Sequence, residues 1–151
     1  IGWGANQKSS LADIKYYYGQ GQLSDFLGRT NILINVLPLT SDTANIITKK
    51  ELSLIPKDSF IINIGRGGII NENDLMTLLS EGHIKAAALD VFAQEPLPEN
   101  NSLWDHPSVY ITPHIAGQSN PNSAGQTISE NIHRIQKGEL PYPIYSGVNG
   151  Y

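Results

Sequence analysis

The sequence predicts an α/β fold with an open parallel sheet, and three observations carry this prediction. The 151 residues contain four short apolar runs, segments with helix-type periodicity lie between them, and the composition of 40% hydrophobic and 16% charged residues is typical of a globular chain. Alternation of strand and helix implies parallel strands joined by right-handed crossovers. A chain of this length can bury a core of its own.

The predicted strands are nearly continuous apolar runs. Such runs are typical of strands that are buried on both faces, as in a parallel sheet. The four strands are Ile32–Leu37, Ser59–Ile64, Ala86–Val91 and Val109–Thr112. The connection from the third strand to the fourth is rich in proline and asparagine, so we expect a long irregular loop there, of the kind that is usually functional or disordered.

The first two helices are predicted from their ends. One lies around Gln22–Leu27 and stops at Gly28. The next starts at a capping box, in which Thr48 is the N-cap and Glu51 follows three residues later, and it ends at Pro56.

The last two helices are predicted in the same way. Asn71 caps the third helix, and Gly82 stops it where a left-handed residue is favoured. The fourth begins near Asn122 and ends at Gly138. Its apolar residues fall on one face, and they are Ala124, Ile128, Ile132 and Ile135.

The charge and the cysteine content argue against several kinds of ligand and cross-link. The net charge is −4 without a run of Lys or Arg, so we expect neither nucleic acid nor an anionic membrane surface as a partner. The absence of Cys excludes disulfides and Cys-ligated zinc within the chain, and we expect no metal site. Because the chain opens at Ile1 rather than Met, we expect a piece of a longer protein whose targeting signals, if any, would lie upstream. We expect that protein to be cytoplasmic.

Charged side chains follow three of the predicted strands. Arg66 comes after the second strand, Asp90 closes the third with Glu95 in the loop behind it, and His114 follows the fourth. Ligands of an open parallel sheet bind beyond the carboxyl ends of its strands. We therefore expect one cation, two carboxylates and one imidazole to converge on one edge of the sheet.

Each of these residues also has an ordinary structural interpretation. A lone His is usually structural. Arg66 between glycines could be a solvated turn residue, and Asp90 and Glu95 could be turn and loop carboxylates. The glycines around Arg66 lack the spacing of a phosphate-binding loop. The conjunction favours a functional site, because unrelated residues would not all fall at successive carboxyl ends.

Other candidate positions are weaker. His83, His106 and His133 are interpreted as structural or solvent-exposed. The segment Gly2–Gln7 begins like a dinucleotide-binding fingerprint, but Gln7 stands where the third glycine is needed and no amphipathic helix opens there.

Three segments together resemble the signature segments of the D-2-hydroxyacid dehydrogenases. They are Asn63–Gly68 (NIGRGG), Leu89–Pro98 (LDVFAQEPLP) and Thr112–Gly117 (TPHIAG), and the match in order and spacing extends over essentially the whole chain. Ser102–Pro107 and the tail Asn149–Tyr151 look most like the glyoxylate/hydroxypyruvate reductase A branch of this family.

The resemblance implies a role for each charged residue of the edge. Arg66 would hold the carboxylate and carbonyl of a small 2-oxo acid such as glyoxylate or hydroxypyruvate. His114 would give a proton to the carbonyl oxygen as hydride arrives from the nicotinamide, and would take it back in the reverse direction. Glu95 would hydrogen-bond the imidazole and keep it oriented and protonated. Asp90 would lie near the nicotinamide carboxamide.

The resemblance also implies a nicotinamide cofactor. The loop Gly4–Lys8 contains no acidic residue for a ribose hydroxyl, which favours NADP over NAD, with Lys8 and Asn6 left to meet the 2′-phosphate. The further positions that the family implies for cofactor contacts, besides those named above, are Leu37, Pro38, Ile64, Gly65, Ala116 and Gly117.

The same comparison implies a truncated Rossmann-like fold. Ile1–Gly4 would be the end of its second strand, so the first strand, the glycine-rich fingerprint and an N-terminal substrate domain would be missing. Residues 1–118 would be the C-terminal part of the cofactor-binding domain. Residues 119–151 would be a helix and tail that pack on the substrate domain, and their unpartnered apolar stripe predicts self-association of this chain. For the full-length protein we expect a homodimer.

Two alternatives remain open at this point. The first is another dehydrogenase of the family, of the D-lactate or phosphoglycerate type, which would carry the same Arg66, Glu95 and His114. The second is a non-catalytic regulator that binds NAD. Formate oxidation is disfavoured, because that branch has Gln at the position of Glu95.

Overall fold

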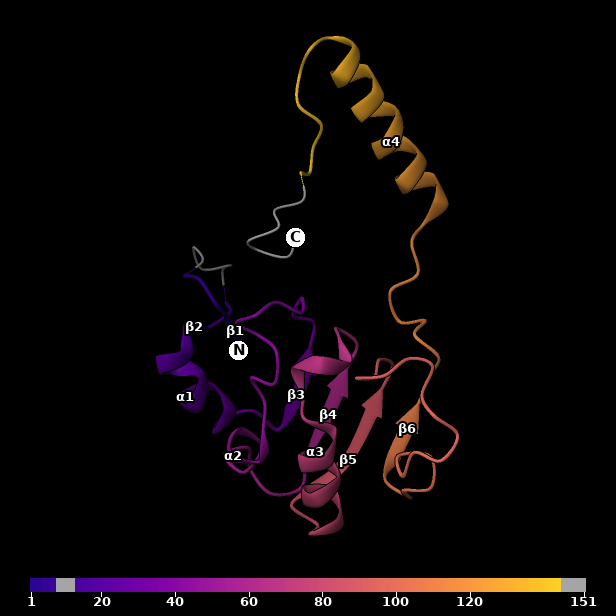
Figure 1. Ribbon diagram of the computed structural model, residues 1–151. Helices are drawn as coiled ribbons and strands as arrows, with labels where there is room; N and C mark the ends of the chain where they lie inside the picture. The colour runs from indigo at the N-terminus through magenta and orange to yellow at the C-terminus, as the bar shows by residue number, and fades with distance from the viewer. Residues whose placement is uncertain (8–12, 145–151) are drawn as a thin grey trace. The chain divides into compact units, whose positions relative to one another are not determined.

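The computed structural model describes residues 1–7 and 13–144. It divides into two compact units, Ile1–His114 and Ile115–Tyr151. The helices and strands of the first unit (Figure 1) are, in chain order, β1 (Gly2–Gly4), β2 (Tyr16–Tyr18), the 3-10 turn Gln20–Gln22, α1 (Leu23–Leu27), β3 (Ile32–Asn35), α2 (Lys49–Leu52), β4 (Ser59–Asn63), the 3-10 turn Gly67–Ile69, α3 (Glu72–Ser80), β5 (Ile84–Leu89) and β6 (Val109–Ile111). The second unit contains α4 (Pro121–Gln136).

The main sheet has four parallel strands in the order β3-β4-β5-β6. Neighbouring strands therefore follow one another in the chain, as strand–helix–strand units with right-handed crossovers require. All four strands were predicted, and the loop between residues 92 and 108 contains no helix or strand, as expected. The strands β1 and β2 form a separate parallel pair.

Local capping explains where two of the helices start. The Asn71 side chain accepts a hydrogen bond from the Asp74 amide at 3.1 Å, and α3 ends before Gly82, whose φ is 67°. The Glu51 carboxylate accepts from the Thr48 amide at 3.2 Å, which completes the predicted capping box of α2. The helix α2 is nevertheless shorter than predicted, because it ends at Leu52, four residues before Pro56.

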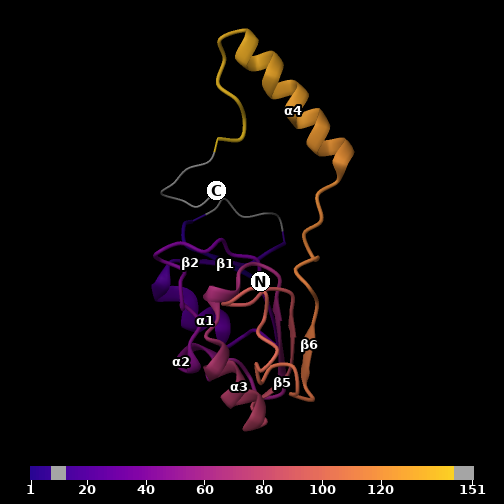
Figure 2. The ribbon, with the colours of Figure 1, turned by 45° about the vertical axis from the view of Figure 1, so that its right-hand side comes forward.

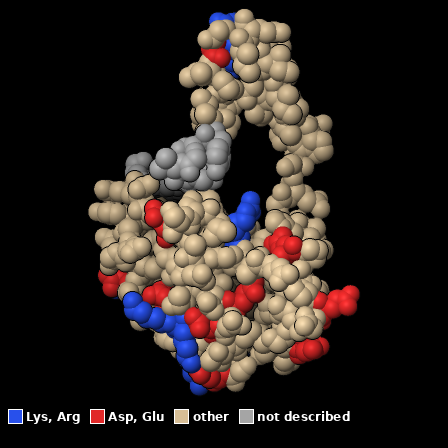
Figure 3. All heavy atoms as spheres, in the orientation of Figure 1, with Lys and Arg blue, Asp and Glu red and all other residues tan. Residues whose placement is uncertain are grey.

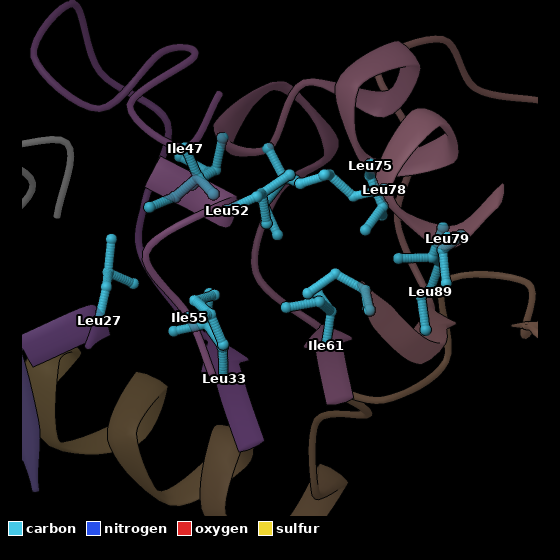
Figure 4. Packing of buried hydrophobic residues seen from close by; sticks show 14 of the residues in the cluster. Leu27, Leu33, Ile47, Leu52, Ile55, Ile61, Leu75, Leu78, Leu79 and Leu89 are labelled. Atoms are coloured by element: carbon cyan, nitrogen blue, oxygen red, sulfur yellow. The ribbon is translucent and has the colours of Figure 1, made fainter. Parts of the chain in front are cut away.

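The core lies between these helices and one face of the main sheet. Leucines of the helices pack against aliphatic residues of the strands, as Figure 4 shows for Leu52, Leu75 and Leu78 around Ile61. Leu52 and Ile61 are fully buried, and Leu75 is 1% exposed. Burial of such side chains contributes roughly 1.5–3 kcal/mol each.

The opposite face of the sheet is uncovered, so the expectation that the strands are buried on both faces is wrong for this chain. Ile34 is 54% exposed, Phe60 39% and Tyr110 65%. The reason is topological. The strands are added in one direction from β3 to β6, so right-handed crossovers place α2 and α3 on the same face (Figure 2).

A groove of about 410 Å³ separates the two sheets. It is lined by residues of β1, α1 and β3, among them Trp3, Phe26 and Ile34. Both β1 and β3 stand at the edge of their sheets, so unpaired strand edges border the groove.

The second unit consists mainly of α4. The Asn120 side chain accepts from the Asn122 amide at 2.9 Å, Pro121 occupies the first turn, and the helix ends before Gly138, whose φ is 77°. The unit starts at Ile115, four residues before the expected domain boundary, and the division of domains in a full-length protein stays a prediction. No helix in the described part of the chain combines the length and hydropathy that a membrane span requires.

Charged side chains are mixed on the surface of the first unit. On the face that Figure 3 shows, acidic groups are scattered, whereas basic groups gather mainly at the lower left, where acidic groups lie beside them. Two of the ion pairs join Lys49 to Glu81 at 2.8 Å and Lys50 to Glu51 at 3.5 Å. These pairs are exposed at one or both partners, and contribute little to stability.

Candidate active site

The four parallel strands end at one edge of the main sheet, and the loops behind them carry the predicted site. Arg66 follows β4, Asp90 and Glu95 follow β5, and His114 follows β6. All four residues belong to the first unit.

The centre of the site is a contact between His114 and Glu95. The Nδ1 atom of His114 lies 2.7 Å from Oε2 of Glu95. The other carboxylate oxygen, Oε1, accepts a hydrogen bond from the Phe92 amide at 2.9 Å. The carboxylate is thus fixed between its own loop and the imidazole, and the Nε2 atom of His114 is the ring nitrogen that faces away from Glu95.

The electrostatic surroundings keep Glu95 ionised. Its pKa lies below the ordinary value of 4.5, chiefly because of the hydrogen bond from the Phe92 amide and then because of the hydrogen bond with His114. The charges of His114 and Arg66 act in the same direction and outweigh the opposing effect of partial burial. Arg66 and His114 are therefore both close enough to Glu95 for their charges to lower its pKa.

Arg66 leads out of β4 in extended backbone conformation and has an exposed side chain. Its Nη1 atom donates to the carbonyl oxygen of Gly65 at 2.7 Å, which holds one arm of the guanidinium. The next residue, Gly67, lies directly against the loop after β5, because a Cβ atom there would stand 1.8 Å from the Phe92 carbonyl carbon. Only glycine lets the Arg66 loop approach the Glu95 loop this closely.

Asp90 is buried and links the ends of two strands. Its Oδ1 atom accepts a hydrogen bond from the Thr112 hydroxyl at 2.5 Å. This bond fixes the end of β5 to the residue that follows β6, two positions before His114. Thr112 was not predicted as a site residue, because a threonine at the end of an apolar run gives no signal of its own.

Two buried asparagines were also missed. Asn35 and Asn63 lie opposite each other in the register of β3 and β4, and the Asn35 side chain donates to Oδ1 of Asn63 at 2.8 Å. The available signal was an amide side chain inside each apolar run, immediately before the loop that carries the site.

Apolar side chains stand at the ends of β3 and β4, beside the charged residues of the site. Ile64 exposes 40% of its surface, and Leu37 and Pro38 are half-buried. Apolar surface next to a few fixed polar groups is typical of sites for small molecules and cofactors. Among residues 1–7 and 13–144, no three His, Asp or Glu side chains form a group that could hold a metal ion.

The structure does not assemble all of the predicted cofactor contacts. Asn6 is exposed just after β1, and Gly65 is buried beside the end of β3. Lys8 lies outside the described residues. Ala116 and Gly117 are exposed residues of the second unit. The role of these positions stays a prediction.

Comparison with known proteins gives a consistent picture. A family model described as D-isomer specific 2-hydroxyacid dehydrogenase, NAD binding domain, matches residues 1–116. The chain is 41% identical over 149 residues to glyoxylate/hydroxypyruvate reductase A of Photorhabdus laumondii, a match that covers 99% of this chain and 47% of that relative. The chain thus spans about half the length of the curated relatives it matches.

Two solved structures superpose closely on this chain. A D-isomer specific 2-hydroxyacid dehydrogenase from Xanthobacter autotrophicus Py2, in complex with NADPH and MES, gives a TM-score of 0.93 at 36% identity and covers 99% of this chain and 61% of its own. An NADPH-dependent glyoxylate/hydroxypyruvate reductase from Sinorhizobium meliloti, in complex with NADP and sulfate, gives 0.90 at 33% identity and covers 99% of this chain and 48% of its own. The predicted Rossmann-like α/β fold is confirmed.

Proposed function

This chain belongs to the D-isomer specific 2-hydroxyacid dehydrogenase family, and from this we propose that it is the cofactor-binding half of a glyoxylate/hydroxypyruvate reductase. The proposed reaction is the reduction of a small 2-oxo acid to the D-2-hydroxy acid. The observation that carries the proposal is the contact between His114 and Glu95, next to a loop that presents Arg66.

Arg66 is proposed to bind the substrate. A guanidinium has a planar set of donors that matches a carboxylate and an adjacent carbonyl oxygen, and it keeps its charge at any physiological pH. The bond from Nη1 to Gly65 leaves the other guanidinium donors available to an anion. Sulfate in the structure of the Sinorhizobium meliloti reductase shows that this relative binds a small anion as well as NADP.

His114 is proposed to move the proton. Its Nδ1 atom is engaged by Glu95, so Nε2 is the atom that would donate a proton to the substrate carbonyl oxygen as that carbon is reduced. The ionised Glu95 stabilises the imidazolium before transfer and holds the ring in one orientation afterwards. In the direction of oxidation, the neutral ring takes the proton back from the hydroxyl group.

NADP(H) is proposed as the cofactor, and when bound it supplies the hydride. Ile64, Leu37 and Pro38 would offer apolar surface to the nicotinamide half, and Asp90 would stand near its carboxamide. Asn6 and Lys8 would meet the 2′-phosphate, since no acidic residue stands in the loop Gly4–Lys8 to favour NAD. The complexes of the two similar structures contain NADPH and NADP, respectively.

The test is NADPH oxidation by the full-length protein with glyoxylate and with hydroxypyruvate. Replacement His114→Ala should lower kcat by about a hundredfold or more, as loss of a general acid does. His106→Ala is the matched control, because that ring accepts a hydrogen bond from the Ser108 amide in a turn away from the site. Near-normal turnover by His114→Ala would refute the assignment of the acid.

The substrate panel separates the remaining candidates. Pyruvate as the sole substrate reduced would favour a D-lactate type enzyme over the glyoxylate reductase. Tight binding of NADP(H) without turnover of any 2-oxo acid would favour a regulator.

A further inference from the structure

Two buried amide side chains join the loops behind β3 and β4. Asn35 is the last residue of β3, Asn63 is the last residue of β4, and they are 5% and 2% exposed. A buried polar side chain is destabilising unless hydrogen bonds satisfy it. The contacts of these two amides are therefore informative.

The amides are satisfied by each other and by the loops that follow them. Besides accepting from Asn35, Oδ1 of Asn63 accepts from the Gly65 amide at 3.3 Å, and Nδ2 of Asn63 donates to the carbonyl oxygen of Arg66 at 3.3 Å. Oδ1 of Asn35 accepts from the Leu37 amide at 3.1 Å. The pair thus bonds to the backbone of both loops.

The two loops are also in direct contact. A Cβ atom on Gly65 would stand 2.9 Å from the Leu37 carbonyl oxygen and 3.0 Å from Nδ2 of Asn35. There is no room for a side chain between the segment that presents Arg66 and the segment that contains Leu37 and Pro38. The spacing of these segments is set by the amide pair and by this close approach.

We propose that Asn35 and Asn63 are positioning residues, which hold the Arg66 loop at a fixed distance from the Leu37–Pro38 turn. The guanidinium that would bind the substrate is thereby kept at a fixed distance from the apolar surface that would contact the nicotinamide. This inference rests on the proposed substrate-binding role of Arg66. The residues touch neither substrate nor cofactor and act through the backbone of Arg66 and Leu37.

Both members of the pair are uncharged, and this matters for the positioning role. An Asp at position 35 would lose the donor and place two acceptors face to face in a buried position, whereas two amides satisfy each other without charge. The hydrogen bonds of the pair thus fix how the ends of β3 and β4 are arranged, and they do so without placing an additional buried charge near Arg66 and Glu95.

The test is a double-mutant cycle in the full-length protein, with Asn63→Ala, Arg66→Ala and both together. Loss of the amide should raise KM for the 2-oxo acid by roughly tenfold, the order expected for a displaced charge-assisted contact, while KM for NADPH and kcat change less. If Asn63 acts through Arg66, the double variant should resemble Arg66→Ala within about twofold. Multiplicative effects on KM would overturn the proposal.

A matched control separates positioning from loss of stability. Ser59→Ala removes another buried polar group of β4, whose hydroxyl donates to the Pro56 carbonyl oxygen at the opposite end of the strand. It should leave KM for the acid unchanged. If Asn63→Ala fails to fold, Asn35→Ala takes its place in the same cycle. An unchanged KM for the 2-oxo acid in the folded Asn35→Ala variant would then refute the proposal.

The outcomes also distinguish the two proposals. If Arg66→Ala leaves KM for the 2-oxo acid unchanged, the proposed role of Arg66 fails. If Arg66→Ala raises it and the folded asparagine variant does not, only the positioning role fails.

Discussion

The geometry at His114 depends on an unusual backbone conformation. Its φ is 55°, in the left-handed region that histidine enters more readily than most residues other than glycine. The His114 amide donates to the Thr112 carbonyl oxygen at 3.1 Å, which closes a tight turn around Pro113. Such conformations cost roughly 1–3 kcal/mol and persist where the surroundings fix them. Here the bond to Glu95 and the bond between Thr112 and Asp90 provide that support.

The lowered pKa of Glu95 predicts a pH dependence of stability. A carboxyl group whose pKa is lower in the folded state stabilises the fold above its unfolded pKa, near 4.5, and this contribution is lost as the pH falls through the folded value. Urea midpoints of the chain and of Glu95→Gln, measured between about pH 3 and pH 7, should therefore differ most at the neutral end and converge at the acidic end. Glu99→Gln, an exposed carboxyl group of the same loop, serves as the control. A difference that grows as the pH falls would contradict the assigned direction.

At the scale of elements, the loops behind β4 and β5 fit together through one glycine. Gly67→Ala would place a methyl group on the Phe92 carbonyl, which rigid backbone on both sides cannot avoid. We expect a loss of about 1–3 kcal/mol in the free energy of unfolding, the range for overpacking, together with reduced affinity for substrate because Arg66 moves. Urea unfolding measures the first effect.

The control for Gly67→Ala is Gly21→Ala. No atom lies within 4 Å of a Cβ atom at that position, and its φ is not in the left-handed region. This substitution should change stability by no more than about 0.5 kcal/mol. Equal losses in the free energy of unfolding for the two substitutions would show that the close approach of the loops does not cause the effect of Gly67→Ala.

The elements that could be predicted are those with local causes. The strands β3 and β4 begin at the predicted residues, Ile32 and Ser59, and α3 begins after its predicted cap, Asn71. The strand β1 lies within Ile1–Gly4, which only the family resemblance assigned to a strand. The strand β2, Tyr16–Tyr18, was not predicted, because three tyrosines do not form an aliphatic run. An apolar run also does not reveal whether both of its faces are covered, since the cover comes from elements elsewhere.

The candidate site was predictable to a similar degree. The edge of the sheet follows from the parallel topology, so residues that follow the strands, such as Arg66 and His114, could be assigned to it. The pair of Asn35 and Asn63 could not, because the partner lies 28 residues away and only the register of β3 against β4 brings the two side chains together. The contact between Asp90 and Thr112 could not be predicted either, although Asp90 itself was assigned to this edge, because the two residues are 22 positions apart.

At the scale of the whole chain, three apolar surfaces lack cover in the described part. They are the outer face of the main sheet, the groove between β1 and β3, and a stripe on α4. Contiguous exposed apolar surfaces often mark sites of interaction with another segment or protein. Since the chain spans about half the length of its curated relatives, we expect segments of a longer protein to cover them, and we expect this chain alone to self-associate.

The stripe on α4 gives this expectation a direct test. Ile128, Ile132 and Ile135 are 60%, 50% and 59% exposed, and their spacing places them on one side of the helix. Replacement of all three by Gln, a good helix former, should lower the apparent mass of the 151-residue chain in size-exclusion chromatography with light scattering. The helical content should stay the same in circular dichroism.

The control carries Glu130→Gln and Lys137→Gln, which lie on the opposite side of α4 or just beyond its end and leave the net charge unchanged. Its association should match that of the unmodified chain. If the triple variant also associates as the unmodified chain does, the stripe is not the contact, and the uncovered face of the sheet becomes the surface to test, through Ile34→Lys and Tyr110→Lys. Loss of association in those variants but not in the α4 triple variant would place the contact on the sheet, because a buried lysine there would oppose docking of any apolar partner.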